Sequence, residues 1–404
     1  MTANPKLDEN NVEYALGTAE CVLNSAVSRR AGSDGESVAQ HIFYDELKKY
    51  CDETKEDKIK IHAGAGTLIE KFLCALLVIC AVLFSASVEY GNTFFASISI
   101  VLNLAVFCVF SYKFIFDGKK LNFVTRSGES KNLLGTRYSK YETRSRVVLV
   151  GRSDAPQRMR LLNLGNKMQF AVVIFAVIGN TLLFCSEMFF LFAGAPQNSA
   201  IFSFLRNLSF FFVPFYIASM FLTDRKKTAS GVSASIVPSS VLLSVMKQFH
   251  DNGFRYEKTE VCCLIAGADY SSRSGSYAFA EKYKRLFRDV PTVFIPIEEL
   301  TTSKSLSVFF KDGSGTKGSA EVASVIGEAA DNLKIDIKKE NYFLGSGAFT
   351  PFTENHFSAC SLGTSKKHTA KCFSAESDKL CDVSREMIAD VGGLLIETLN
   401  YYDG

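Results

Sequence analysis

Long apolar segments fill two parts of the chain, residues 72–116 and 168–222, whereas polar residues interrupt the rest as in ordinary soluble domains. Four of these segments are long enough to cross a lipid bilayer, for which about 20 helical residues suffice. They are Phe72–Val88, Thr93–Tyr112, Met168–Gly194 and Ala200–Leu222. One such segment alone could be the core helix of a soluble protein. Four of them, paired by short loops, predict two transmembrane hairpins over residues 67–116 and 168–223.

Two hairpins return the chain to its starting side, so residues 1–66, 117–167 and 224–404 should share one compartment. The two loops on the other side contain no Lys or Arg, but basic residues gather at the membrane ends on the shared side. These are Lys71, Lys113, Lys119, Lys120, Lys167, Arg225, Lys226 and Lys227. Because positively charged flanks usually stay in the cytoplasm, we expect an integral membrane protein with cytoplasmic termini and soluble parts. The N-terminus shows no apolar segment typical of a cleaved signal peptide.

Two charges interrupt the second predicted hairpin. Glu187 lies seven residues before Gly194 and Arg206 lies six residues after Ala200. At 1.5 Å per helical residue, both would lie about 10 Å below the same surface. An unpaired charge is costly at that depth, so we predict that Glu187 and Arg206 form an ion pair. Alternatively, Arg206 extends to the interface alone.

Charge and cysteine content narrow the range of partners. A net charge of +3 without interleaved basic and aromatic residues gives no indication of nucleic-acid binding. Of the 11 cysteines, four lie inside the apolar segments, and the others lack the spacing of a zinc site or a disulfide framework. The expected partners are therefore the lipid bilayer and a peptide or protein.

The soluble parts alternate between strand and helix patterns. Helices are predicted over 36–51, 232–249, 276–287 and 384–402, and strands over 131–136, 146–151, 261–267 and 290–297. The strands show no alternation of apolar and polar residues and are separated by helices, which indicates a mostly parallel, mixed α/β sheet covered by helices on both faces. In such folds, sites collect beyond the carboxyl ends of the strands, where Arg152, Asp154, Asp269 and Tyr270 occur.

Seven segments, in this order along the chain, resemble a known family. They are SRRAGSDGESVAQHIFYDELKKYCDE, SKNLLGT, VVLVGRSDAP, TASGVSASI, LIAGADYSSRSGSYAFAEKY, ENHFSACSLG and FSAESDKLCDVSREMI. Together they are similar to the conserved segments of metallopeptidase family twenty-eight, the dizinc aminopeptidases related to bacterial leucyl aminopeptidase. The resemblance implies the α/β fold of the zinc exopeptidases, a phosphorylase/hydrolase-like fold, which in this chain would be interrupted by the two hairpins.

The resemblance also implies where a dizinc site would lie. In that family, His and carboxylate side chains hold two zinc ions, and a Glu acts as general base. The ligand positions fall on Arg152, Lys227, Tyr270, Glu298 and Ser374, and the general-base position falls on Asp269. Asp154, which in the family orients the first His ligand, is retained.

These residue types argue against zinc. Arg152 is a permanent cation without a lone pair to donate, and Lys227 would more naturally be a cation than a ligand. We hypothesise that Arg152 and Lys227 replace the metals electrostatically and neutralise Asp154, Asp269 and Glu298. Alternatively, the site has drifted and these side chains are solvated.

Three functions remain open from the sequence. The favoured one is a membrane-anchored, aminopeptidase-like pseudoenzyme without a metal cofactor, which binds a peptide or a partner protein. The second is an active metal-dependent aminopeptidase with rearranged zinc ligands, for which Asp269, Glu298, His356 and His368 are the candidates. The third is a scaffold subunit of a membrane complex.

Overall fold

The computed structural model describes residues 2–62, 65–116, 128–159, 166–194, 199–301, 305–342, 346–365 and 378–404. The chain divides into two compact units. An α/β unit comprises Met1–Ala63, Thr125–Arg158 and Lys226–Gly404, and a helical unit comprises Gly64–Val124 and Met159–Arg225.

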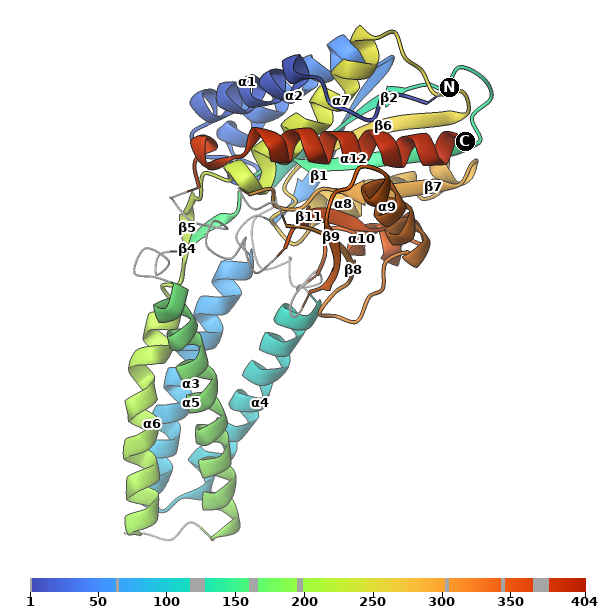
Figure 1. The fold of residues 1–404 in the computed structure, drawn as a ribbon. Coiled ribbons are helices and arrows are strands. Elements are labelled where there is room, and N and C mark those ends of the chain that lie inside the picture. The colour runs from blue at the N-terminus through green and yellow to red at the C-terminus, as the bar shows by residue number, and fades with distance from the viewer. Residues whose placement is uncertain are drawn as a thin grey trace. The chain divides into compact units, whose positions relative to one another are not determined.

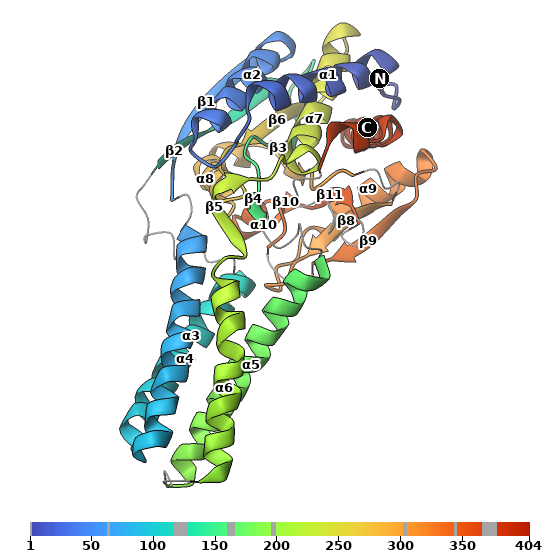
Figure 2. The same cartoon turned by 90° about the vertical axis from the view of Figure 1, so that its left-hand side faces the viewer.

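Four helices form the helical unit, as two antiparallel hairpins that pack into a bundle (Figures 1 and 2). They are α3 (Ala65–Tyr90), α4 (Thr93–Phe116), α5 (Asn166–Phe192) and α6 (Ala200–Ser219). Apolar side chains fill the bundle core, among them Phe84, Leu183 and Phe190. Others cover its outside, such as Val101 and Phe204, each 65% exposed. A helix that is apolar on every side is typical of a membrane span.

Among the described residues, five helices are long and apolar enough to cross a membrane. Four of them are the bundle helices. The fifth, Val232–Asp251, is 94% buried inside the structure. Since it belongs to the core of the α/β unit, its apolar composition reflects burial in protein.

The predicted ion pair between Glu187 and Arg206 does not form, so this prediction is wrong. Arg206 Nη1 lies 2.6 Å from Glu89 Oε2 at the end of α3. The Glu187 side chain is fully buried and accepts a hydrogen bond from Ser99 Oγ on α4. Depth alone placed the two charges at one level, but Arg206 contacts α3 and Glu187 contacts α4, so the two side chains do not meet.

We therefore expect Glu187→Gln and Arg206→Gln to act independently. The amide oxygen introduced at position 187 can still accept from Ser99, and Arg206 pairs with a side chain that is 64% exposed, so both single losses should be modest. Thermal unfolding in detergent measures the free energy of unfolding that each variant loses. The loss in the double variant should equal the sum of the two single losses within about 0.5 kcal/mol. A double variant that is no less stable than either single variant would support the predicted ion pair between Glu187 and Arg206.

A six-stranded mixed sheet forms the centre of the α/β unit, with the strand order β1-β2-β6-β3-β7-β10. The strands are β1 (Glu53–Ile61), β2 (Gly128–Arg137), β6 (Thr259–Ala266), β3 (Ser145–Arg152), β7 (Thr292–Pro296) and β10 (Ser358–Ala359). β2 runs antiparallel to both of its neighbours, whereas β6, β3, β7 and β10 run parallel to one another. The predicted mixed α/β sheet is confirmed.

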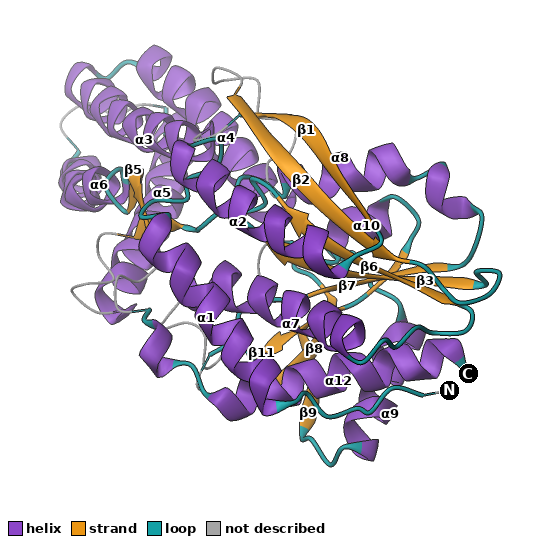
Figure 3. Ribbon diagram, turned by 90° about the horizontal axis from the view of Figure 1, so that it is seen from above, coloured by secondary structure: helices purple, strands orange, loops and turns teal. Residues whose placement is uncertain are grey.

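Helices cover both faces of this sheet (Figure 3). On one face lie α2 (Asp34–Tyr50), α7 (Val237–Asp251) and α12 (Arg385–Asp403), and α1 (Glu9–Ser25) packs against these helices; on the other face lie α8 (Ser274–Tyr283) and α10 (Thr350–Glu354). In β3, Val147 and Leu149 join the first core, and Val148 and Val150 join the second. Two buried faces explain why the four residues Val147–Val150 of β3 are all apolar.

Smaller elements complete the α/β unit. Strands β11 (Ser361–Thr364), β8 (Leu306–Lys311) and β9 (Ile337–Asn341) form a second sheet, which α9 (Ala320–Asn332) covers. Strands β4 (Gln157–Met159) and β5 (Thr223–Thr228) pair with each other, and the division between the units falls within them. The predicted helix over 232–249 begins as a π-helical turn, Val232–Ile236, and Pro238 lies in the first turn of α7, where its missing N–H costs nothing.

Candidate functional site

Three neighbouring parallel strands end at one place in the α/β unit. β3 lies between β6 and β7, with Arg152 opposite Ala266 and Val150 opposite Pro296. Arg152 is the last residue of the central strand, and Asp269 and Glu298 follow the two flanking strands within three residues. The fold therefore delivers one guanidinium from the middle and one carboxylate from each side.

The Arg152 guanidinium contacts both carboxylates. Its Nε donates to Asp269 Oδ2 at 3.1 Å, and its Nη2 donates to Glu298 Oε2 at 3.3 Å. All three side chains are at most 2% exposed. Nη1 donates to the Tyr270 hydroxyl at 3.0 Å. Burial alone would lower the pKa of Arg152, but Tyr270, Glu298 and Asp269 outweigh it and raise the pKa well above its ordinary value.

The second cation of the cluster is Arg273, not the predicted Lys227. Arg273 Nη1 lies 3.5 Å from Asp269 Oδ2, and its Nη2 donates to the Ser346 carbonyl at 3.2 Å. Lys227 is exposed on β5, and none of the interactions in the described structure joins it to these carboxylates. It belongs to the basic run Arg225–Lys227 that follows the apolar helix α6. We call Arg152, Arg273, Asp269 and Glu298 the Arg152 cluster; its two positive and two negative charges balance.

Backbone N–H groups satisfy the remaining carboxylate oxygens of the cluster. Asp269 Oδ1 accepts from Ser276 N in the first turn of α8, and Glu298 Oε1 accepts from Ala348 N at 2.8 Å. A carboxylate at a helix N-terminus is favoured by the helix dipole. Both carboxylates are therefore held in place by several donors and have few lone pairs left for a ligand.

A second buried layer supports the cluster around Asp154. Asp154 Oδ2 accepts from Tyr270 N at 2.8 Å, and the Tyr270 hydroxyl donates to the Ala234 carbonyl at 2.9 Å. Arg29, 2% exposed, donates to the Ser230 carbonyl at 2.6 Å. Burial lowers the pKa of Arg29 to about 10, although Asp154 opposes this shift.

Glu36 connects this layer to the first turn of α2. Its carboxylate accepts from Gly32 N, from Ala268 N, each at 2.6 Å, and from Ser153 Oγ at 3.2 Å. Ser33 caps the same helix by accepting from Glu36 N. The spacing Ser33–Glu36 is the sequence signature of a capping box, so Glu36 could have been found from the sequence.

Strained backbone lies in the loop that carries Asp269. Ala268, Ser272 and Arg273 have φ values of 51°, 55° and 53°, in the left-handed region that residues other than glycine rarely adopt. Strain of this kind persists only where surrounding contacts fix the backbone, and it concentrates at functional sites.

The other sequence candidates lie elsewhere. Ser374 and His368 fall outside the described residues. His356 lies after α10 and lines a hollow with Arg146 and Arg288, residues at the amino-terminal side of β3 and β7.

The residues present do not fit a zinc pair. Arg152 has no lone pair, and its guanidinium already neutralises the two carboxylates that could ligate. Over the ranges that the structure describes, no group of three or more His, Cys, Asp or Glu side chains is placed to hold a metal ion.

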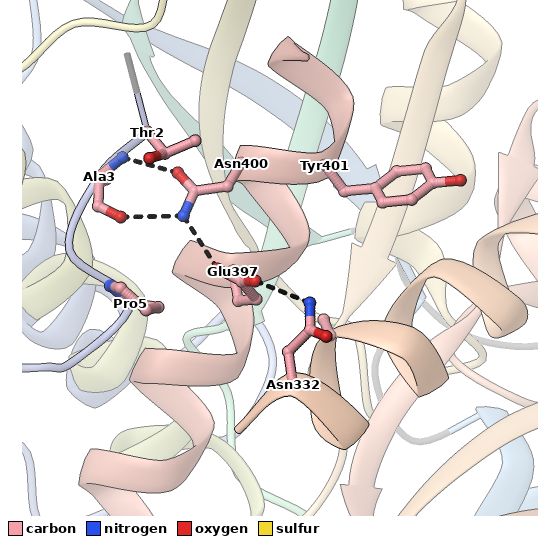
Figure 4. Close-up of a pocket in the computed structure, with 8 residues that line it drawn as sticks. Thr2, Ala3, Pro5, Asn332, Glu397, Asn400 and Tyr401 are labelled. Carbon is pink, nitrogen blue, oxygen red and sulfur yellow. Dashed lines mark hydrogen bonds between the residues drawn. The ribbon is translucent and has the colours of Figure 1, made fainter. Parts of the chain in front are cut away.

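A separate hollow of about 390 Å³ lies between the N-terminal segment, α9 and α12 (Figure 4). There Glu397 accepts from Asn332 Nδ2 and Asn400 Nδ2, both at 3.0 Å, and Asn400 also binds the backbone of Ala3. Its lining includes no member of the Arg152 cluster, and its one carboxylate is engaged by two amides. We assign it no chemistry.

Solved structures share this architecture at very low sequence identity. A glutaminyl cyclase from Fimbriiglobus ruber aligns with a TM-score of 0.58 and 10% identity over 99% of this chain and 96% of its own. A Zn-dependent exopeptidase from Parabacteroides distasonis aligns at 0.56 and 9%, over 98% and 99%. A leucine aminopeptidase precursor from Bacteroides thetaiotaomicron aligns at 0.56 and 8%, over 99% of each chain.

The chain has the fold of these exopeptidases and cyclases. At such identities the likeness concerns the fold alone. No protein-family model and no curated protein matches the sequence. The exopeptidase-type fold predicted from the sequence is thus present, and its strand ends carry the Arg152 cluster.

Replacing Arg152 by Met should destabilise the α/β unit strongly. The change removes the cation between two buried carboxylates, which typically costs about 3–5 kcal/mol. Arg385→Met is the matched control, because its ion pair with Glu13 joins side chains that are 70% and 51% exposed, and it should cost almost nothing. Thermal unfolding of the two variants measures the difference; equal losses would contradict the proposed role of Arg152.

Asp154 should make stability fall as pH rises. Burial, reinforced by Glu36, raises the pKa of its carboxyl well above the ordinary value. The folded chain then binds more protons than the unfolded chain. The contribution of the Asp154 carboxyl to the free energy of unfolding is therefore fully present below about pH 4 and is lost as pH rises toward the folded pKa. Asp154→Asn should flatten this decline when the free energy of unfolding is measured between about pH 4 and 7. The control Asp382→Asn, at an exposed position, should leave the decline as in the parent chain.

Proposed function

We propose that this chain is a membrane-anchored pseudopeptidase that lacks zinc-dependent catalysis and acts by binding a protein partner. The bundle helices would cross the bilayer and the α/β unit would lie in the cytoplasm. The observation that carries the proposal is the Arg152 guanidinium, which occupies the space between Asp269 and Glu298 and contacts both.

The chemistry of the cluster supports the loss of catalysis. A general base must accept a proton from water, within hydrogen-bonding distance of the reacting group. Asp269 has one oxygen bound to a backbone N–H and the other to two guanidinium groups, and its side chain is 1% exposed. The residue at the general-base position therefore has about one acceptor site left, and its burial keeps it away from water.

The membrane anchor rests on composition and packing. Four helices are long and apolar enough to span a bilayer, and apolar side chains are exposed on their outer faces. The basic residues at the helix ends near the α/β segments favour a cytoplasmic location for that unit.

Burial of the cluster favours a protein partner over a small peptide held by the former catalytic carboxylates. Asp269 and Glu298 could receive an amino group only if Arg152 moved away, which would expose two unpaired charges. An active aminopeptidase is the weaker alternative, because Asp269, Glu298 and His356 are not grouped as metal ligands in the described structure. A scaffold role in a membrane complex is one form of the binding function proposed.

Metal content and activity test this proposal together. The purified full chain should contain no stoichiometric zinc by mass spectrometry, and it should show no aminopeptidase or glutaminyl cyclase activity with or without added zinc. It should also float with liposomes in a density gradient, since the bundle is apolar on its outside.

Stoichiometric tightly bound zinc, or an amidase activity abolished by a chelator, would refute the loss of catalysis. Recovery of the intact chain in the soluble fraction, away from liposomes, would refute the membrane anchor.

A further inference from the structure

The helical unit contains a cavity of about 260 Å³ that all four bundle helices line. Its walls are mostly apolar and include Leu73 and Leu77 from α3, Val106 and Phe110 from α4, and Ala176 from α5. Apolar cavity walls favour apolar molecules. If the bundle lies in a bilayer, as the proposed function requires, the molecules available to fill the cavity are lipids.

Polar groups occur at two levels of the cavity. Glu70 and Thr223, joined by a hydrogen bond of 3.1 Å, lie at the end where α3 begins and α6 has ended. Tyr216 and Asn180 line the cavity further into the bundle. The Tyr216 side chain is fully buried.

The inner polar groups lack partners. The Tyr216 hydroxyl and Asn180 Oδ1 are buried and make no hydrogen bond in the described structure. A buried polar atom without a partner typically costs about as much as the loss of a hydrogen bond, so a cavity that carries two of them calls for a ligand that satisfies both. Tyr216 offers a donor and Asn180 offers an acceptor.

We infer that this cavity binds a neutral lipid that carries a hydroxyl group on an apolar body. A hydroxyl both accepts, here from Tyr216, and donates, here to Asn180, whereas an unsubstituted acyl chain can do neither. The apolar body fills the space among Leu73, Val106 and Ala176. A long-chain alcohol and a polycyclic alcohol share this chemistry.

Photolabelling in nanodiscs tests this inference with the full chain. The probes are a diazirine-bearing long-chain alcohol, a diazirine-bearing sterol and the methyl ether of each. We expect one of the alcohols to label cavity residues such as Cys74 and Val177, about tenfold more than its ether, because the ether cannot donate to Asn180. The alcohol that labels identifies the source of the ligand.

Variants separate the polar contact from the apolar space. Tyr216→Phe and Asn180→Leu should remove the preference for the alcohol over the ether but keep labelling by both. Ala176→Phe, which fills the cavity, should remove labelling by both. Val101→Phe is the matched control, because Val101 points outward from α4 and is 65% exposed, and it should change nothing.

Labelling spread evenly over outward positions, or equal labelling by alcohol and ether, would overturn the inference. A chain that floats with liposomes but is not labelled in the cavity refutes this inference alone. A chain that does not float at all refutes the membrane anchor on which the inference rests.

Discussion

The α/β unit depends on one constraint: a permanent cation at the end of the central strand must be neutralised out of water. Arg152 cannot lose its proton, and at 2% exposure it cannot reach solvent. The fold meets this constraint because the flanking parallel strands deliver Asp269 and Glu298 to the same point. Each carboxylate also accepts a hydrogen bond from a backbone N–H, Asp269 from Ser276 at the start of α8 and Glu298 from Ala348. The positions of α8 and of the loops that carry these residues therefore depend on the Arg152 charge.

The same arrangement explains why this site cannot be judged by its carboxylates alone. Two acidic side chains at the ends of neighbouring strands are what a metal ion or a general base would need. The guanidinium between them changes their chemistry, because it occupies the lone pairs that a metal would use. Arg273 adds a second cation to Asp269 and balances the cluster without any group from outside the described chain.

Much of the fold could be predicted from the sequence because burial leaves a clear pattern. The strands β3, β6 and β7 and the helices α2, α7, α8 and α12 were all expected, since their apolar positions follow the strand or helix period. The strands β1 and β9 were missed because they carry polar residues at most positions, as in ETKEDKIKI and IKKEN. Their pairing depends on neighbours distant in sequence, which no local pattern records.

The candidate site shows a similar limit. Strand ends identified Arg152, Asp154, Asp269 and Tyr270, because their position follows from the topology of the sheet, whereas Glu298 came from the family resemblance. The choice of Lys227 as second cation failed because a basic membrane flank and a site residue look alike in sequence. Arg273 was missed because it contacts Asp269 from a loop residue with a left-handed backbone, which no sequence pattern indicates. The partners of Glu187 and Arg206 depended on the rotation of each helix about its axis, which depth arguments leave undefined.

The strand order has a consequence for how this chain reaches its folded state. β6 lies between β2 and β3, although residues 259–266 follow both of those strands, and all four bundle helices, in the sequence. During synthesis β2 and β3 therefore emerge long before the strand that joins them, and the sheet centre cannot close until every helix of the bundle has left the ribosome. Domains whose contacts join residues distant in sequence fold slowly, and their apolar strands are exposed until folding is complete. If the bundle is the membrane anchor proposed above, its helices would enter the membrane before the sheet is complete, so the anchor would precede the domain that it anchors.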